Sequence, residues 1–205
     1  MKKNTQKITI MITSLALLLL VAAGTTLAYI FTKTEPVENT FKPSKVSCAV
    51  VENGSATENT GNIVATGATK TNVQIKNTGD TDAYIRVAVV VNWASEDGKK
   101  VWAQKPVLGT DYSIAYATET GWIPGADGYY YYTKSVTPGT LTGTLINQAK
   151  KLQTAPPEGY YLSIEIVASA IQSKPDHVVG QQWSSEAVTV AGNNGTLTVD
   201  DNQGG

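Results

Sequence analysis

Side chains suited to catalysis are scarce in this chain. His177 is the only histidine and Cys48 the only cysteine among 205 residues. A zinc protease of the His-Glu-x-x-His type needs two histidines, and the Gly-x-Ser-x-Gly elbow of many serine hydrolases does not occur in the sequence. His177 follows Pro175 and Asp176 near a predicted helix start, where we expect an exposed polar side chain. We therefore expect a protein that is not an enzyme, with no cofactor and no metal centre.

Calcium is the metal for which the sequence offers the better ligands. Asn77, Asp80 and Asp82 lie within one short turn, and oxygen-rich turns bind calcium in extracellular modules. The full twelve-residue calcium loop is absent. Asn and Asp also favour turns because their side chains hydrogen-bond the neighbouring backbone, and we favour this local role.

A row of aromatic residues is the best candidate for ligand binding. Trp122 precedes four consecutive tyrosines at 129–132. Because side chains alternate along a strand, Tyr129 and Tyr131 would share one face. With Trp122 they form a candidate platform for stacking on sugar rings. The alternative places one tyrosine pair in the core and the other on the surface.

Cys48 has no partner for an intramolecular disulfide. It shares one face of an alternating segment with Val46 and Val50, so we expect a buried, unreactive thiol on a strand. An intermolecular disulfide is the alternative.

Short alternating segments between turns must position these side chains. Only 16% of residues are charged and 18 are glycine, which is typical of extracellular β proteins. One short helix is expected, capped by Ser173, and 52–69 and 150–158 are predicted loops. The pattern predicts an all-β, jelly-roll-like antiparallel β-sandwich. The predicted strands are 46–51, 70–77, 83–93, 112–117, 122–124, 129–133, 140–146, 160–172, 187–190 and 196–199.

Two of these strands have the clearest alternation. Val73 and Ile75 share one face of 70–77, and the odd-numbered residues from Ile85 to Trp93 share one face of 83–93. The Gly- and Asp-rich turn at 78–82 is short, so we expect the two strands to form a β-hairpin.

The first 28 residues predict export. Lysines at positions 2, 3 and 7 precede an apolar run that ends in small residues at 24–28, the arrangement of a secretory signal peptide. We place the cleavage between Ala28 and Tyr29; an uncleaved membrane anchor is the alternative. Removing residues 1–28 leaves 13 of the 16 basic residues and all 17 acidic ones. We therefore expect an extracellular protein that does not bind nucleic acid and meets the membrane only before cleavage.

The mature chain divides into three parts. Residues 29–45 contain Pro36 and Pro43 and read as an extended N-terminal arm. The sandwich domain is expected over 46–199, and 200–205 form a polar, flexible tail.

Several segments together resemble a known family. The signal ends in Gly-Thr-Thr-Leu-Ala-Tyr at 24–29, the arm contains Asn-Thr-Phe at 39–41, and 73–87 reads Val-Gln-Ile-Lys-Asn-Thr-Gly-Asp-Thr-Asp-Ala-Tyr-Ile-Arg-Val. These segments resemble the TasA/camelysin family of Gram-positive bacteria, in its clostridial branch. The likeness is closest over 1–50 and 70–93, and looser at 127–132 and 159–165. It implies a jelly-roll sandwich exported through a dedicated, ER-type signal peptidase.

The resemblance also implies a function, as a subunit of a fibre at the cell surface or in the biofilm matrix. In such fibres the N-terminal arm of one subunit adds a strand to the next. Here the arm offers Tyr29, Ile30, Phe31, Val37 and Phe41, which could enter pockets while the backbone pairs with a sheet edge. Head-to-tail contact with itself, or with related matrix proteins, does not close and so extends a filament. The alternatives are a monomeric glycan-binding module at the cell surface and, because camelysin has been described as one, a metalloprotease.

Overall fold

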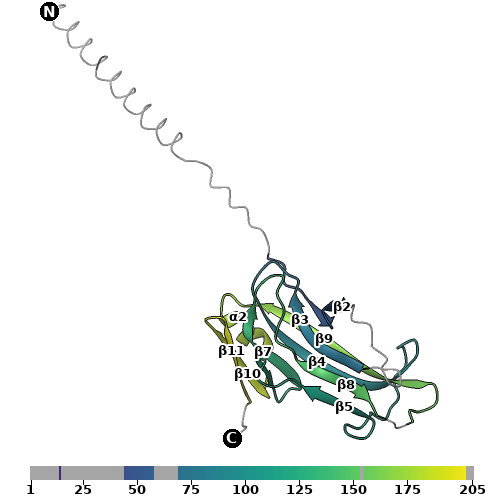
Figure 1. Ribbon diagram of the computed structural model, residues 1–205. Coiled ribbons are helices and arrows are strands. Elements are labelled where there is room, and N and C mark those ends of the chain that lie inside the picture. Colours follow the sequence, from purple (N-terminus) through teal and green to yellow (C-terminus); the bar gives the residue numbers. More distant parts are fainter. Residues whose placement is uncertain (1–13, 15–43, 58–68, 153–154, 202–205) are drawn as a thin grey trace, which may run out of the picture. The chain divides into compact units, whose positions relative to one another are not determined.

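The structure, a computed structural model, describes residues 14, 44–57, 69–152 and 155–201. The chain divides into two compact units, Met1–Pro43 and Ser44–Gly205, and every element named below belongs to the second (Figure 1). These elements are β1 (Cys48–Glu52), β2 (Ser55–Thr57), β3 (Thr69–Asn77), β4 (Ala83–Ser95), β5 (Tyr112–Tyr116), β6 (Trp122–Pro124), β7 (Tyr129–Val136), β8 (Ile146–Lys151), β9 (Tyr160–Gln172), α2 (His177–Trp183), β10 (Val188–Asn193) and β11 (Thr196–Asp201).

The strands form two antiparallel sheets. One has the order β2-β1-β3-β8-β5 and the other β10-β11-β7-β4-β9, with β6 pairing with β7. Between β3 and β9 the chain crosses repeatedly from one sheet to the other, as in a jelly roll. The predicted all-β antiparallel sandwich is confirmed. Within the described residues no helix is long and apolar enough to cross a membrane.

The main core lies between the two sheets and follows the alternation in the sequence. In β4, Ile85 and Val87 are fully buried and Trp93 nearly so, and in β9 Leu162 and Ile164 are fully buried. All five belong to one cluster of packed side chains. Burial of each Val, Leu or Ile side chain contributes roughly 1.5–3 kcal/mol, so the buried face of each strand stabilises the sandwich.

The predicted hairpin of 70–77 with 83–93 is wrong. β3 pairs with β1 and β8, whereas β4 pairs with β7 and β9 in the other sheet. The intervening turn is a corner between sheets. It is fixed by the buried Asn77 side chain, whose Nδ2 donates to the carbonyls of Thr81 and Val136, each at 2.8 Å.

Two further strand assignments differ from the prediction. The strand expected at 140–146 instead runs over Ile146–Lys151, while Thr142 lies beside β3 and exchanges hydrogen bonds with Ile75. Part of the loop expected at 52–69 is β2, which forms a hairpin with β1. Asn53 and Gly54, with φ of 49° and 79°, make its turn. An Asn-Gly pair favours this type I′ turn, and the prediction overlooked it.

Helix α2 covers part of the outer face of the β10–β9 sheet. Its N-cap is Asp176, three residues after the predicted Ser173. Val179 and Trp183 are buried and pack in a second cluster with Tyr84 and Tyr131. The outward residues Tyr84 of β4 and Tyr131 of β7 are therefore buried, because they have a helix to pack against.

Candidate functional site

Within the described residues, strand β9 has a hydrogen-bonded partner on one side, strand β4. It pairs with β4 over all 13 residues without a register shift. The Ser173 N–H donates to the Asp82 carbonyl at 2.9 Å, so the odd-numbered residues of β9 bond β4 and the even-numbered ones point away. Within the described residues no strand pairs on that side. The backbone groups that point away, here called the β9 edge, belong to Leu162, Ile164, Ile166, Ala168, Ala170 and Gln172.

The β9 edge is long and lacks the usual protection. Its 13 residues span roughly 43 Å at about 3.3 Å per residue. Soluble proteins protect edge strands by keeping them short, by bulges, or with Pro and Lys. The other outer strands described here are short: β2 has three residues, β10 six, and β5 five with a register shift. β9 contains no Pro and no Lys, and Glu165 is its only charged residue.

Apolar side chains flank the β9 edge on both faces of the sheet. On the inner face Ala168 and Ala170 are partly buried against the core, and β1 of the opposite sheet contacts β9. On the outer face Tyr161 and Val167 are exposed, as is Val90 on β4. A strand added at this edge would find backbone partners and apolar surface together.

The turn after β3 holds the chain where residues 29–43 join the sandwich. The Thr78 and Gly79 N–H groups donate to the Ser47 carbonyl at 2.9 and 3.1 Å, and the Asp80 N–H donates to the Lys45 carbonyl at 2.9 Å. In return the Lys45 N–H donates to Asp80 Oδ1 at 2.7 Å. These bonds, here called the Lys45 clamp, fix the point from which the N-terminal segment departs.

Gly79 lets the Lys45 clamp close. A Cβ atom at this position would lie 2.3 Å from the Lys45 carbonyl oxygen, well inside van der Waals contact. Asn77 Oδ1 accepts a hydrogen bond from the Gly79 N–H at 2.9 Å. The sequence Asn-Thr-Gly-Asp therefore serves close backbone packing.

The calcium interpretation of this turn finds no support in its geometry. Asn77 and Asp80 each use a side-chain oxygen to accept a backbone N–H, while Asp82 is exposed. No group of three or more His, Cys, Asp or Glu side chains that could hold a metal ion is present among residues 14, 44–57, 69–152 and 155–201. The local hydrogen-bonding role is the one that the geometry shows.

The structure separates the three residues of the predicted sugar platform. Trp122 packs against the main core, with its ring 5.1 Å from that of Tyr132, and its Nε1 donates to the Gly143 carbonyl at 2.8 Å. Tyr129 and Tyr131 belong to the cluster under α2 on the opposite face of the sheet. Tyr131 has no exposed surface, so these three residues do not form one platform.

In this cluster the rings of Tyr129 and Trp183 hold a cation between them. The Arg86 guanidinium lies 4.2 Å from the centre of the Tyr129 ring and 4.8 Å from that of Trp183, a cation–π sandwich. The Tyr131 hydroxyl donates to Asp127 Oδ2 at 2.6 Å. Burial, and then this hydrogen bond, raise the pKa of Tyr131 to about 12, partly opposed by Arg86. This cluster fastens α2 to the sheet.

The two residues with the most reactive side chains lie apart. Cys48 begins β1, is half-buried and packs against the main core, and burial raises the pKa of its thiol, so the thiolate is disfavoured. His177 is exposed at the first position of α2, as predicted. Cys48 and His177 therefore belong to different elements and do not form a common site.

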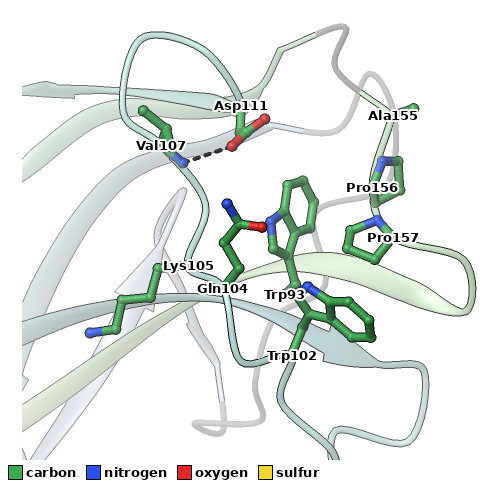
Figure 2. Close-up of a pocket in the computed structure, with 9 residues that line it drawn as sticks. All are labelled: Trp93, Trp102, Gln104, Lys105, Val107, Asp111, Ala155, Pro156 and Pro157. Carbon is green, nitrogen blue, oxygen red and sulfur yellow. Dashed lines mark hydrogen bonds between the residues drawn. The ribbon is translucent and has the colours of Figure 1, made fainter.

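One pocket is lined by none of the residues that the sequence predicted as site residues. It is a cavity of about 320 Å³ at the end of the sandwich where β4 stops and β9 starts. Figure 2 shows Pro156 and Pro157 on one side of the indole rings of Trp93 and Trp102, with Gln104 on the other. The two tryptophans are nine residues apart and the prolines more than 50 further on, so no local pattern in the sequence marks them as neighbours.

The predicted cleavage site at Ala28 and Tyr29 and the arm residues Ile30, Phe31, Val37 and Phe41 lie outside the described residues. No family model matches the sequence, and neither a curated protein nor a solved structure matches it. The likeness to the TasA/camelysin family thus remains a resemblance carried by the segments quoted above.

Proposed function

We propose that this chain is a secreted structural protein that polymerises head to tail, the N-terminal segment of one copy pairing with the β9 edge of the next. The observation that carries the proposal is the β9 edge itself: an unprotected 13-residue strand, paired on one side within the described residues. Such an edge is a template for strand addition. The TasA/camelysin-like sequence segments support the same function.

The N-terminal segment has the length that the proposal requires. Residues 29–43 would reach roughly 50 Å if extended, at about 3.3 Å per residue, which matches the length of the β9 edge. The Lys45 clamp holds the base of this segment, so tension in a fibre would be carried into the turn after β3 through paired backbone bonds. Apolar side chains at Tyr29, Phe31 and Phe41 would supply the register.

The direct test compares two chains by electron microscopy at matched concentrations. Residues 29–205 are expected to form filaments and residues 44–205 only monomers. A synthetic peptide of residues 29–43 added to the shorter chain should bind and slow amide exchange at alternate residues of β9. Filaments from both chains would overturn the role of the N-terminal segment. Monomers from both, with the peptide failing to bind, would overturn the proposal as a whole.

Pairing of the N-terminal segment with its own β9 is a separate outcome of the same test. It would give monomers from residues 29–205 with the amides of Ile164, Ile166 and Ala168 already protected from exchange. Because the even-numbered amides of β9 point away from β4, their protection reports on an added strand and little else. Intermolecular and intramolecular pairing are then distinguished by particle size.

A further inference from the structure

The pocket at the end of the sandwich has a rigid frame. Trp102 continues β4 around a turn: its N–H donates to the Trp93 carbonyl at 2.8 Å, and Val101 forms a bridge with Ala94. The Trp102 ring is held edge-on by Tyr160, with ring centres 5.1 Å apart. Two indoles are therefore fixed at the mouth between the sheets before any ligand arrives, which lowers the entropic cost of binding.

Asp111, on the polar side of the pocket, is also held in place. Asp111 Oδ2 accepts the Val107 N–H at 2.7 Å, and the Asp111 N–H donates to the Val107 carbonyl at 2.8 Å. The Leu152 N–H donates to the Asp111 carbonyl, also at 2.8 Å, which ties this loop to the end of β8. In Figure 2 the Gln104 amide points toward Trp93, while the Lys105 side chain points away from both rings.

The surfaces that remain open have a particular chemistry. Trp102 is 42% exposed although its position is fixed, so one part of a flat aromatic ring faces solvent at the cavity. Gln104 lines the cavity and is exposed, and its amide offers one acceptor and two donors. Pro156 and Pro157 close the opposite side with apolar rings that present no N–H.

We propose that this pocket binds one pyranose ring of a carbohydrate. The volume of about 320 Å³ is at the small end of ligand pockets, which range over about 300–1,000 Å³. A pyranose ring has an apolar C–H face, which would lie on Trp102, and hydroxyls at its rim, which would meet Gln104 and Asp111. A purely apolar ligand would cover the Gln104 amide without pairing it, at a cost in affinity. The site is independent of the β9 edge and does not rest on fibre formation.

The test is a titration of residues 29–205 with tetrasaccharides of glucose, of N-acetylglucosamine and of galactose. Binding is measured by calorimetry and by tryptophan fluorescence. At least one is expected to bind saturably, with a dissociation constant of about 1 mM or tighter, the range for a ligand of roughly a dozen heavy atoms in contact. Trp102→Ala is expected to weaken binding at least tenfold and Gln104→Ala about threefold to tenfold.

Tyr161→Ala is the matched control, because Tyr161 is 40% exposed, lies beside Tyr160 in β9, and does not line the pocket. This variant is expected to bind as the parent does. Far-ultraviolet circular dichroism checks that each variant is folded, and Gln104→Ala, on the surface, keeps the test decisive if Trp102→Ala unfolds. Absence of saturable binding to all three sugars would overturn the proposal, as would unchanged binding by a folded Trp102→Ala. So would binding of a tyrosine- or proline-rich peptide in place of sugar.

Discussion

Two proline substitutions at adjacent positions of β9 test which backbone N–H groups bond β4 and which point to the β9 edge. Val167 has an odd number, so its N–H belongs to the ladder with β4, opposite Ala88; Ala168 has an even number, so its N–H points to the β9 edge. Proline removes the N–H in either case. We therefore expect Val167→Pro to disrupt the sandwich and Ala168→Pro to leave it folded while weakening strand addition.

The expected difference in stability follows from the bonds at each position. Val167→Pro removes a donor and leaves the Ala88 carbonyl without its partner, which together with ring clash costs about 3 kcal/mol or more. Ala168→Pro removes no bond of the described ladder, so its cost is about 1 kcal/mol, from forcing φ towards −65° in a strand. A gap of at least about 2 kcal/mol in unfolding free energy should separate the two variants.

Urea unfolding measures that gap, and electron microscopy with sedimentation measures polymerisation of residues 29–205. Ala168→Pro is expected to remain folded and to form fewer, shorter filaments. Equal destabilisation by both substitutions would refute the register argument for β9. Normal filaments from folded Ala168→Pro would refute the β9 edge as the acceptor.

Two further predictions concern stability alone. Gly79→Ala would place a methyl group 2.3 Å from the Lys45 carbonyl oxygen and is expected to cost about 2–4 kcal/mol of unfolding free energy, through overpacking and strained bonds of the Lys45 clamp. The control, Gly98→Ala, lies in open space at a φ of +70° and should cost only about 1 kcal/mol. Equal urea midpoints for the two variants would contradict this prediction. The folded state raises the pKa of Tyr131 from 10.0 to about 12, so its contribution to stability is complete below pH 10 and is lost as pH rises towards 12. Tyr131→Phe, which also removes the bond to Asp127, should therefore lose less stability than the parent over that range in pH-dependent denaturant titrations, and parallel curves would contradict the assignment.

The strands were largely predictable because one face of each strand packs in the core while the other faces solvent. The strand predicted at 160–172 coincides with β9, and the one at 83–93 falls within β4. In both, the residues predicted to face inward form the main core. Period-2 alternation is local information, and burial between two sheets selects for it directly.

Pairing was not predictable in the same way. The turn at 78–82 has the composition of a hairpin turn, yet β3 and β4 belong to different sheets. The deciding bonds run from this turn to Lys45 and Ser47, and from Asn77 to Val136, which is 59 residues away. A turn former favours reversal of the chain, but remote hydrogen bonds decide whether the reversed strand joins the same sheet.

The aromatic residues show the same division. Local alternation correctly put Tyr129 and Tyr131 on one face, but only the position of α2 shows that this face is covered and that Tyr131 is buried. Conversely, Trp93, Trp102 and Pro157 carry no shared local pattern, and the fold brings them together around one cavity.

The sequence by itself determined the fold class of this protein, because its alternation and turn residues predict an all-β sandwich. The tertiary structure alone decided which strand is left with one partner, which turn holds the start of the sandwich, and which aromatic rings remain open to a ligand. The physical reason is the distance along the chain between the residues that interact. Alternation is a property of neighbouring residues. An unpaired strand edge or a pocket, in contrast, depends on which of the described residues, often distant in the sequence, lie next to it in space.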